Sequence, residues 1–598
     1  MTQSRARVGI FGWGIVAPRS PDVSSFERNL ETASTWLEPF DGFGPDNFLV
    51  GRPEFRLESY REWLSARFPP SRLNQIQTKM GMPTQYAMGA FIQALGQNPG
   101  IEQELRSLGT AAHVYVGTGV GDLPTIYDAS LRLDRAQARW DRFWAEPAHN
   151  CALRRFLGSP DALPGPPRAA AEQAALLGSP GSATSAVAAL AATGELGAAG
   201  ERGTTAELRA AAALDAMAEL EACGSSPPPH PATVAAADYE TRADAERAWN
   251  RFWAVRSPEL AEYLAELRRI EGADVVGEVG AAKKSLLRQK RAANARLQEK
   301  WGAPTPPWDD RLLANVIWNI HNTPASNISM LGGITGLTFA PVGACATFGI
   351  TLKLAMDAVR RGEAKAVVIG AADPPPHPLL VGAFYNGRVI SADGEVSRPL
   401  TGMRGTHVSG GAAIWIVGDW EHMTARGFRP LGLEPVAVGV SADAEHIITP
   451  SEEGPLTAIG AALEEAGVDP GEVSTWDLHA TATPGDWQEV ENLRRVLPES
   501  VLVTARKGIF GHGMGASGGW ELTAQYLGLA RGRIFPTPLA PDELNSEIAK
   551  IHTRFVFDHG CPAPAGVVGK LSMGVGGVNA CVLSRVPSDG LPAPIIDQ

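Results

Sequence analysis

Apolar residues recur along this chain in short runs, and the spacing of these runs predicts its elements. At Val8–Gly12 and again at His113–Val116, a short and mostly apolar run ends at glycine, which is typical of a buried strand followed by a turn. Helical segments separate these runs, so we predict an α/β fold for residues 8 to about 129. The same alternation resumes after residue 310 and continues to about residue 586.

Residues from about 131 to 310 interrupt this alternation and are predicted to form an insertion. The insertion contains an alanine- and glycine-rich tract (169–222), a proline-rich stretch (225–231) and a charged helical segment (274–300). A short motif occurs twice within it, as Trp140–Ala145 and Trp249–Ala254. Packing of two helices through these aromatic residues is favoured over an aromatic ligand box, because large apolar side chains are most often core residues.

The composition predicts a folded protein and excludes several classes. Of the 598 residues, 44% are hydrophobic and 20% charged, a balance that is too apolar for a disordered chain. No run has membrane-spanning length and the first residues lack a signal peptide, so we expect a cytoplasmic protein. The five cysteines form no Cys-x-x-Cys pair, which argues against a disulfide framework or a zinc ribbon. The net charge of −12 argues against a nucleic-acid partner.

Cys345 is the first candidate for chemistry. It lies at a strand-to-helix junction, because the segment around it precedes an amphipathic stretch at 348–361 that closes at Gly362. A thiol at a helix N-terminus meets the positive end of the helix dipole, which lowers its pKa and favours the thiolate. A small buried cysteine fits the same position, and position alone leaves both interpretations open.

Two histidines lie in similar surroundings. His479 follows a predicted strand at 473–477, and His512 lies in a glycine-dense turn before a helix that is expected to begin near Ser517. Because open α/β sheets collect ligands at the carboxyl ends of their strands, these histidines and Cys345 form a candidate for one convergent site. No cluster in the chain has the spacing of metal ligands.

Two glycine-rich segments have different interpretations. Gly117–Gly121 lacks the acidic residue and the full spacing of a dinucleotide-binding loop, so a plain turn at a strand end is favoured. The segment 570–580 (KLSMGVGGVNA) could present backbone N–H groups to an oxyanion, whereas a tight hairpin is the simpler alternative.

With these motifs in order, the chain resembles the β-ketoacyl synthase family, of the elongating Cys-His-His type, within the thiolase-fold superfamily. The resemblance runs from residue 8 to about 128 and from about 322 to 585. It implies an α/β thiolase-like fold, with two similar halves in αβαβα layers. The N-terminal half would span residues 1–430, interrupted by the mostly helical insertion at 131–310, and the C-terminal half would span residues 431–598.

The resemblance also implies roles for five side chains. Cys345 would take the acyl group from a carrier thioester, and His479 and His512 would stabilise the enolate that forms when a malonyl unit decarboxylates. Lys507, paired with Glu521 in the following helix, would support the histidines electrostatically.

Further contacts with substrate follow from the same resemblance. The backbone N–H groups of Cys345 and Val575 would form the oxyanion hole. Thr481 and Thr483 match threonines that contact the pantetheine arm, and Thr449 lies in the segment 441–450 that resembles the loop beside that arm. No metal is implied, and the only cofactor is phosphopantetheine, delivered on an acyl carrier protein or as coenzyme A.

Three features depart from the family pattern. The segment from His479 to Asp486 is one residue shorter than usual, which could shift the pantetheine contacts. Met573 and Val575 stand where phenylalanines are usual, one of them the gate of the acyl pocket, so looser control of acyl length is expected. The insertion at 131–310 is not part of the common pattern.

The resemblance therefore predicts a β-ketoacyl synthase, an acyltransferase that performs decarboxylative Claisen condensation in fatty acid or polyketide-like biosynthesis. The alternatives are acyl transfer from the same acyl-enzyme without condensation, and a non-condensing partner subunit. We expect an acyl carrier protein as partner and a homodimer, with a heterodimer with a related subunit as the other option. An acidic carrier protein needs a basic patch on this acidic chain, and the sequence does not locate one.

Overall fold

The computed structural model describes residues 6–44, 46–158, 227–233, 239–274, 279–311 and 313–587. The chain divides into two compact units, one formed by residues 1–127 and 315–598 and the other by residues 128–314. The first unit contains every residue that the sequence selects for chemistry, and the second contains the whole predicted insertion.

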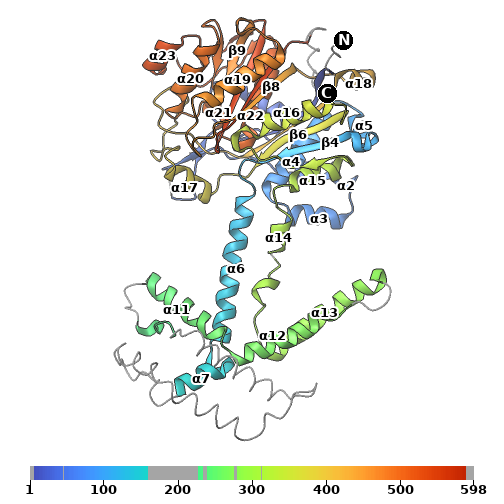
Figure 1. The fold of residues 1–598 in the computed structure, drawn as a ribbon, viewed down its shortest axis with the longest axis vertical. Helices are drawn as coiled ribbons and strands as arrows, with labels where there is room; N and C mark the ends of the chain where they lie inside the picture. The colour runs from blue at the N-terminus through green and yellow to red at the C-terminus, as the bar shows by residue number, and fades with distance from the viewer. Residues whose placement is uncertain are drawn as a thin grey trace. The chain divides into compact units, whose positions relative to one another are not determined.

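The first unit contains two five-stranded mixed sheets (Figure 1). The strands of the first sheet are β1 (Val8–Val16), β4 (Ala112–Gly117), β5 (Thr338–Phe339), β6 (Ala366–Asp373) and β7 (Gly411–Asp419). Those of the second are β8 (Glu434–Ala442), β9 (Val473–Asp477), β10 (Leu502–Thr504), β13 (Val567–Gly574) and β14 (Val578–Arg585).

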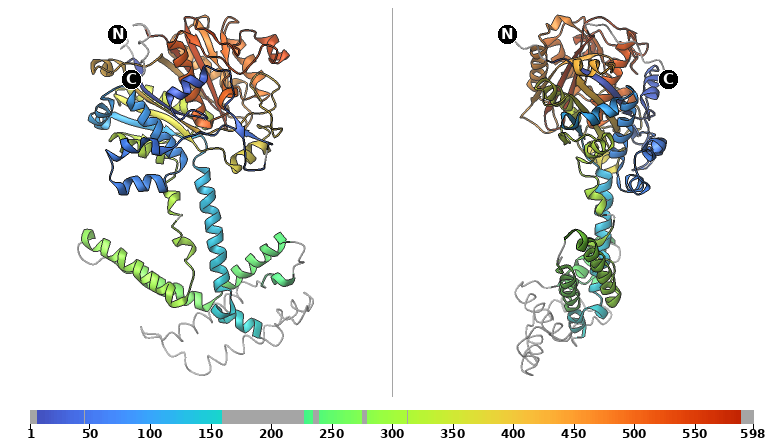
Figure 2. Two further views of the ribbon diagram at one scale, coloured as in Figure 1. Left: turned by 180° about the vertical axis from the view of Figure 1, so that it is seen from behind. Right: turned by 90° about the vertical axis from the view of Figure 1, so that its right-hand side faces the viewer.

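The two sheets have the same topology. Their orders, β1-β7-β6-β4-β5 and β8-β14-β13-β9-β10, are identical when the strands are counted from the first strand of each sheet. In both sheets the first three strands pair antiparallel and the last three pair parallel. The first unit therefore consists of two similar α/β halves, whose strands lie in blue and yellow and in orange and red in Figure 2.

Helices form three layers around these sheets. Helices α4 (Met82–Gly96) and α15 (Thr323–Gly332) pack on the outer face of the first sheet. Helices α16 (Thr347–Arg360) and α22 (Met514–Ala530) lie between the sheets. Helices α19 (Glu453–Ala466) and α20 (Gly485–Val496) cover the outer face of the second sheet. The αβαβα layering predicted from the sequence is observed.

The composition of α22 explains how it fits between two sheets. Every residue from Met514 to Leu529 is buried, and the helix is rich in alanine and glycine. A side chain at Gly519 would meet the Cβ of Ala413 on β7 at 2.4 Å, so a residue without a Cβ is required there. Helix α22 therefore packs in close contact with the first sheet.

The remaining elements of this unit are shorter. They are α1 (Val23–Leu30), β2 (Glu38–Pro39), β3 (Leu49–Val50), η1 (Leu57–Tyr60), α2 (Arg61–Ser65), α3 (Pro70–Lys79), α5 (Ile101–Ser107), α14 (Ala314–Ile317), α17 (Pro378–Asn386), α18 (Trp420–Ala425), α21 (Lys507–Phe510), β11 (Arg533–Ile534), α23 (Ser546–Ile551) and β12 (Cys561–Pro562).

Two local predictions needed correction. Helix α22 begins at Met514, three residues before the expected start, because its first amide donates to His512 Nδ1 at 3.2 Å. Most of the glycine-rich segment 570–580 belongs to strands β13 and β14, and Val575–Gly577 alone form the turn. The tight hairpin is thus the correct interpretation of that segment's backbone.

The second unit is helical in its described part. Helix α6 (Leu123–Trp144) begins in the first unit and continues into this one, where α7 (Cys151–Gly158), α11 (Tyr239–Ala254), α12 (Pro258–Glu271) and α13 (Val279–Trp301) follow. The two aromatic motifs lie on α6 and α11, which contact each other through an Arg251–Asp141 ion pair at 3.2 Å. The alanine- and glycine-rich tract and Cys223 lie outside the described residues.

The aromatic side chains of these motifs are core residues. Trp140 and Trp144 pack with Tyr263, whereas Trp249 and Trp253 form a separate cluster. The motifs supply core residues, as predicted, but the tryptophans of α6 and α11 do not pack against each other, because one pair packs on Tyr263 and Leu297 and the other on Leu153. Within the described ranges, no helix has the length and apolar character needed to cross a membrane.

Candidate active site

Cys345 lies in a strained turn between β5 and α16. The turn η6 (Ala344–Ala346) precedes the helix, and the Cys345 side chain is 5% exposed. Ala344 has φ of +48°, in the left-handed region that is unfavourable for a residue with a Cβ. The Thr347 hydroxyl holds this conformation, because it accepts from Gly343 N–H at 3.0 Å and donates to Ala344 O at 2.7 Å.

The pKa of the Cys345 thiol is raised to about 11, mainly because the side chain is buried. The Lys507 charge and the N–H groups of Val575 and Cys345 lower this pKa, but they do not outweigh burial. The backbone N–H groups lower the pKa, as predicted, but burial outweighs them, so the resting site does not favour the thiolate. The resting residue is a thiol that has donors in place for the negative charge that develops during reaction.

The β13–β14 hairpin places its turn against Cys345. The backbone N–H groups of Val575 and of Cys345 itself lie close enough to the Cys345 sulfur to lower the pKa of the thiol. A Cβ at Gly574 would lie 2.7 Å from Gly343 O and 3.2 Å from Cys345 N, so only glycine allows this approach. The structure therefore brings together the two amides that the resemblance assigns to an oxyanion hole.

His479 follows strand β9 in a loop held by two buried carboxylates. Glu489 accepts from the N–H groups of His479 at 2.6 Å and Ala480 at 2.8 Å. Asp486 accepts from Thr481 N–H at 2.8 Å. Burial raises the pKa of Glu489 to about 7 and that of Asp486 to about 6. These carboxylates fix the backbone that orients the imidazole.

Lys507 lies at the start of α21 and directs its ammonium group at His479. Its Nζ lies 2.6 Å from His479 O, 3.4 Å from His479 Nδ1 and 2.7 Å from Glu521 Oε1. These three contacts match the three N–H donors of an ammonium group. Glu521 is fully buried on α22, so the pair lies away from solvent.

Lys570 is a second buried lysine in this network, and the sequence did not single it out. It lies on β13, with Nζ 2.9 Å from Glu521 Oε2 and 3.3 Å from Leu478 O, and it also contacts Leu571 O. Its contact with Glu521 is an ion pair without an aligned hydrogen bond to the carboxylate. Glu521 thus lies between two lysines, and the group as a whole has an excess of positive charge.

His512 faces His479 across the site. Their ring centroids are 5.4 Å apart, with an angle of 80° between the planes. His512 Nδ1 accepts from Met514 N–H, and His479 Nδ1 accepts from Lys507, so both rings carry their proton on Nε2. The pKa of each lies well below 6.5, because of burial and the nearby Lys507 and Lys570 charges. Both are therefore neutral rings that can donate from Nε2.

Asp373 is another buried charged residue near the site that the sequence analysis did not select. This buried carboxylate ends β6 and accepts from Thr118 Oγ1 at 2.9 Å, Gly119 N–H at 2.8 Å and Ala516 N–H at 3.3 Å. It therefore ties the turn after β4 to the start of α22. Its position at the end of an apolar strand is the only sequence signal that it offers.

The three threonines assigned to the pantetheine arm are not brought together. Thr481 and Thr483 lie side by side after His479, with their hydroxyls 3.0 Å apart. Thr449 is exposed on the loop after β8, and among the described residues it has no hydrogen bond to either of them. That loop does contact the Cys345 region, because Ile447 O accepts from Gly576 N–H at 2.7 Å.

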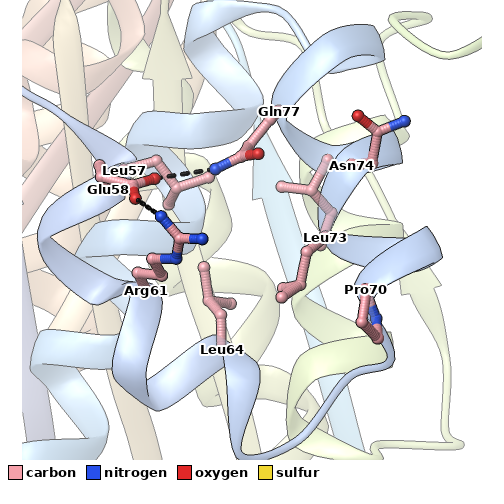
Figure 3. A pocket seen from close by; sticks show the side chains of 9 residues that line it. Leu57, Glu58, Arg61, Leu64, Pro70, Leu73, Asn74 and Gln77 are labelled. Carbon is pink, nitrogen blue, oxygen red and sulfur yellow. Dashed lines mark hydrogen bonds and ion pairs between the residues drawn. The ribbon is translucent and has the colours of Figure 1, made fainter.

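Other possible sites in the described residues offer less. No group of three or more His, Cys, Asp or Glu side chains in the described part of the chain could hold a metal ion. A surface hollow of about 140 Å³ lies between η1, α2 and α3 (Figure 3). Glu58 in the wall of this hollow pairs with Arg61 at 2.7 Å and accepts from Gln77 at 2.8 Å, so the Glu58 carboxylate already has partners.

The comparisons with known proteins agree with this geometry. Residues 276–419 match the model of the β-ketoacyl synthase N-terminal domain, and residues 434–539 match that of its C-terminal domain. The chain is 34% identical over 230 residues to the 3-oxoacyl-[acyl-carrier-protein] synthase 2 of Vibrio cholerae, covering 36% of this chain and 55% of the relative. It is 32% identical over 218 residues to nodulation protein E of a Rhizobium species, covering 36% and 54%. The chain thus spans about half the length of these curated relatives.

Solved structures share the fold. The ishigamide ketosynthase/chain length factor has a TM-score of 0.60 at 17% identity, covering 98% of this chain and 100% of that one. A β-ketoacyl synthase from Burkholderia phymatum has a TM-score of 0.58 at 17% identity, covering 97% and 99%. The ketosynthase in AntDE:AntF, a complex with a type II polyketide acyl-carrier protein, has a TM-score of 0.57 at 16% identity, covering 97% and 100%. The predicted thiolase-like fold is confirmed.

Proposed function

The chain belongs to the β-ketoacyl synthase family, and from this premise we propose that it condenses a Cys345-bound acyl group with a malonyl-type thioester. The observation that carries the proposal is the pairing of a buried thiol beside two backbone N–H donors with two neutral histidines that donate from Nε2. The first group suits covalent capture of an acyl unit, and the second suits stabilisation of an enolate.

Acyl transfer is the first step. The Cys345 sulfur attacks the carbonyl carbon of an acyl thioester, and the thiol proton leaves with the departing carrier thiol. Negative charge develops on the carbonyl oxygen, where the N–H groups of Cys345 and Val575 donate to it. Because the pKa of the thiol is about 11, the Lys507 charge favours the small thiolate fraction that reacts.

Decarboxylation of the second substrate forms the carbon nucleophile. The bond between the malonyl carboxylate and its α-carbon breaks, carbon dioxide leaves, and the electron pair forms an enolate. His479 and His512 each donate an Nε2–H to the enolate oxygen. Both rings are neutral, and Nδ1 of each already accepts a hydrogen bond from the protein. The proton therefore stays on Nε2, which remains a donor without a change in the charge of the ring.

Condensation joins the two units. The enolate carbon attacks the thioester carbonyl on Cys345, and the same two N–H groups stabilise the new oxyanion. Collapse of this intermediate releases a 3-ketoacyl thioester and the Cys345 thiolate. The thiolate then regains a proton, as its high pKa in the resting site dictates.

Buried charges position these groups without touching substrate. Lys507 fixes His479 through its ring nitrogen and its carbonyl oxygen, and Glu521 holds Lys507. Lys570 adds a second support, because it contacts both Glu521 and the carbonyl of Leu478, the residue before His479. We assign Lys507, Glu521 and Lys570 as positioning residues.

Acyl transfer without condensation is the second candidate, and Val575 favours it. Val575 is 45% exposed, and its side chain is smaller than the gating phenylalanine that the family pattern has at this position. A non-condensing subunit has less support, because Cys345, His479, His512 and Lys507 are all present and buried.

Thr481 and Thr483 are proposed to contact a phosphopantetheine arm, carried on an acyl carrier protein or coenzyme A. Their paired, half-buried hydroxyls beside His479 support this role. The exposed position of Thr449 supports a contact nearer the mouth of the site. One structural relative is a ketosynthase in complex with its acyl-carrier protein.

A homodimer is proposed as the working assembly, with a heterodimer with a related subunit as the other option. Strand β5 is at the edge of its sheet, where unpaired backbone groups can add a strand from a second copy. Exposed apolar side chains lie near this edge, at Met330, Leu337 and Val342. The cytoplasmic location also remains a prediction.

Intact-protein mass spectrometry tests the proposal. We expect an acyl adduct on the wild-type chain after incubation with an acyl-carrier thioester and none on Cys345→Ala. Addition of malonyl-carrier should release the adduct as a 3-ketoacyl product with carbon dioxide. An adduct that forms and never condenses would support acyl transfer, and no adduct with any acyl donor would support the non-condensing subunit.

A further inference from the structure

Positive charge is concentrated on one helix of the second unit. The whole chain has a net charge of −12, yet α13 (Val279–Trp301) carries seven lysines and arginines and a single glutamate. In the sequence alone, this helix is one charged segment among several. Its surroundings in the structure distinguish it.

Most of these basic side chains form no ion pair with a side chain in the described part of the chain. Lys300 pairs with Glu266 at 2.6 Å and Lys290 approaches Glu271 at 3.8 Å, both on α12. The other five are exposed, and none of the described residues forms an ion pair with them: Lys283, Lys284, Arg288, Arg291 and Arg296.

The packing of α12 against α13 determines which face is free. The contacts of Glu266 with Lys300 and of Glu271 with Asn294 show an antiparallel pair, in which the end of α12 lies near residue 294. Leu297 is buried in the aromatic core of this unit. The segment of α13 before residue 290 therefore continues past the end of α12 (Figure 1).

Three basic residues share the free face. Lys284, Arg288 and Arg291 follow the spacing i, i+4 and i+7, which aligns side chains along one side of a helix. This side is opposite Leu297 and Lys290. Leu287 lies next to it and is 46% exposed, so the face combines charge with one apolar anchor.

We propose that this basic face of α13, defined by Lys284, Leu287, Arg288 and Arg291, docks an acidic acyl carrier protein. The inference rests on the proposed function, because a carrier-dependent condensing enzyme must attract an acidic partner to a chain that is itself acidic. Complementary charge on a local surface accomplishes this, since it raises the encounter rate and orients the partner despite net repulsion.

Other anionic partners fit this face less well. A membrane-surface helix buries an apolar face in the lipid, but the apolar side of α13 at Leu297 is already packed within the protein. A nucleic acid presents a long polyanion, which the remaining acidic surface of the chain would repel. A compact acidic protein needs only the local patch.

A charge-reversal variant of the full chain tests the proposal. In K284E/R288E/R291E, we expect kcat/KM for Cys345 acylation by an octanoyl-loaded bacterial acyl carrier protein to fall at least about tenfold, mainly through KM. Acylation by octanoyl-pantetheine, which has no protein surface, should stay within about twofold of wild type. Wild-type acylation by the carrier should also weaken with added salt, whereas that of the variant should not.

A matched control separates local from overall charge. R135E/R139E/R242E changes the net charge equally, with exposed arginines on α6 and α11 of the same unit, and should leave carrier-dependent acylation unchanged. An equal fall in both triple variants, or unchanged kcat/KM in the α13 variant, would overturn the proposal.

Direct binding keeps this test independent of catalysis. If octanoyl-pantetheine fails to acylate the wild-type chain, the proposed function fails, and anisotropy of a fluorescent carrier protein still measures docking. Loss of carrier binding in the α13 variant supports the surface. The α13 variant could instead keep carrier binding and lose binding to phosphatidylglycerol vesicles or to a DNA duplex. That result would assign this face to a different partner and overturn the proposal.

Discussion

The two halves of the first unit share a topology and differ in their chemistry. In the first half, the third strand in chain order, β5, leads into the Cys345 turn and helix α16. In the second, its counterpart β10 leads through α21 into the His512 turn and helix α22. One position in the repeated fold thus holds the thiol that we propose as the nucleophile, and the equivalent position holds the histidine that we propose as a hydrogen-bond donor.

The difference extends into the sheets. At the end of the fourth strand of each order, Gly117 on β4 pairs with Ala371 on β6, whereas Asp477 on β9 pairs with Lys570 on β13. The first half is apolar at this position and the second is charged. The repeat provides the scaffold, and under the proposed function the half that contains the buried Lys507 and Lys570 stabilises the enolate while the other half captures the acyl group.

The pH dependence of Cys345 alkylation is the largest effect expected from this difference. Because burial raises the pKa of the thiol to about 11, the thiolate fraction at neutral pH is small and grows about tenfold per pH unit below pH 11. The rate of iodoacetamide modification at Cys345 should rise about a thousandfold from pH 7 to pH 10. Peptide mapping by mass spectrometry measures it at this cysteine specifically. If the alkylation rate instead levels off below pH 8, Cys345 carries a pre-formed thiolate, which contradicts the raised pKa.

Substitution of Lys507 and of Lys570 should lower kcat by different amounts. Lys507→Met deletes the direct contact with His479, so kcat for condensation should fall about 100-fold. Lys570→Met deletes an indirect support and should cost about tenfold. Steady-state assays with thermal melts as a check of folding measure both.

The first half offers a control for these variants. Lys353 on α16 forms an ion pair with Asp357 at 2.9 Å, and Lys353→Met should change kcat less than about twofold. If all three lysine substitutions lower kcat equally, the effect comes from the loss of any positive charge and does not depend on the second half.

The smallest effect concerns the acyl pocket. Val575→Phe restores bulk at a half-exposed position of the hairpin turn, so the range of accepted chain lengths should narrow, with a several-fold loss for the longest acyl donors. Acylation rates over a series from acetyl to dodecanoyl measure this selectivity. If the chain-length profile of the variant is unaltered, Val575 does not control access to the acyl pocket.

Local signals explain how much of the fold the sequence could predict. Strand β9 ends at Asp477 and α16 covers Thr347–Arg360, close to expectation, because apolar periodicity and glycine stops mark both. Cys345, His479 and His512 stand out because each lies in a turn after a strand. The resemblance to a known family then supplied the fold and Lys507.

Tertiary effects explain the rest. Lys570 lies within an apolar strand, 91 residues after His479, and only sheet register brings it to Leu478 O. The raised pKa of Cys345 depends on burial between the halves, which no local pattern encodes. The free face of α13 depends on how far α12 covers it, which the sequence of α13 alone does not contain.

Separate assays of acylation and decarboxylation test the division between the halves most directly. We predict that Cys345→Ala forms no acyl adduct yet still releases carbon dioxide from malonyl-carrier, because both histidines remain. We predict that His479→Ala forms the adduct and releases no carbon dioxide. If instead each variant loses both activities together, the two halves do not divide the chemistry as proposed.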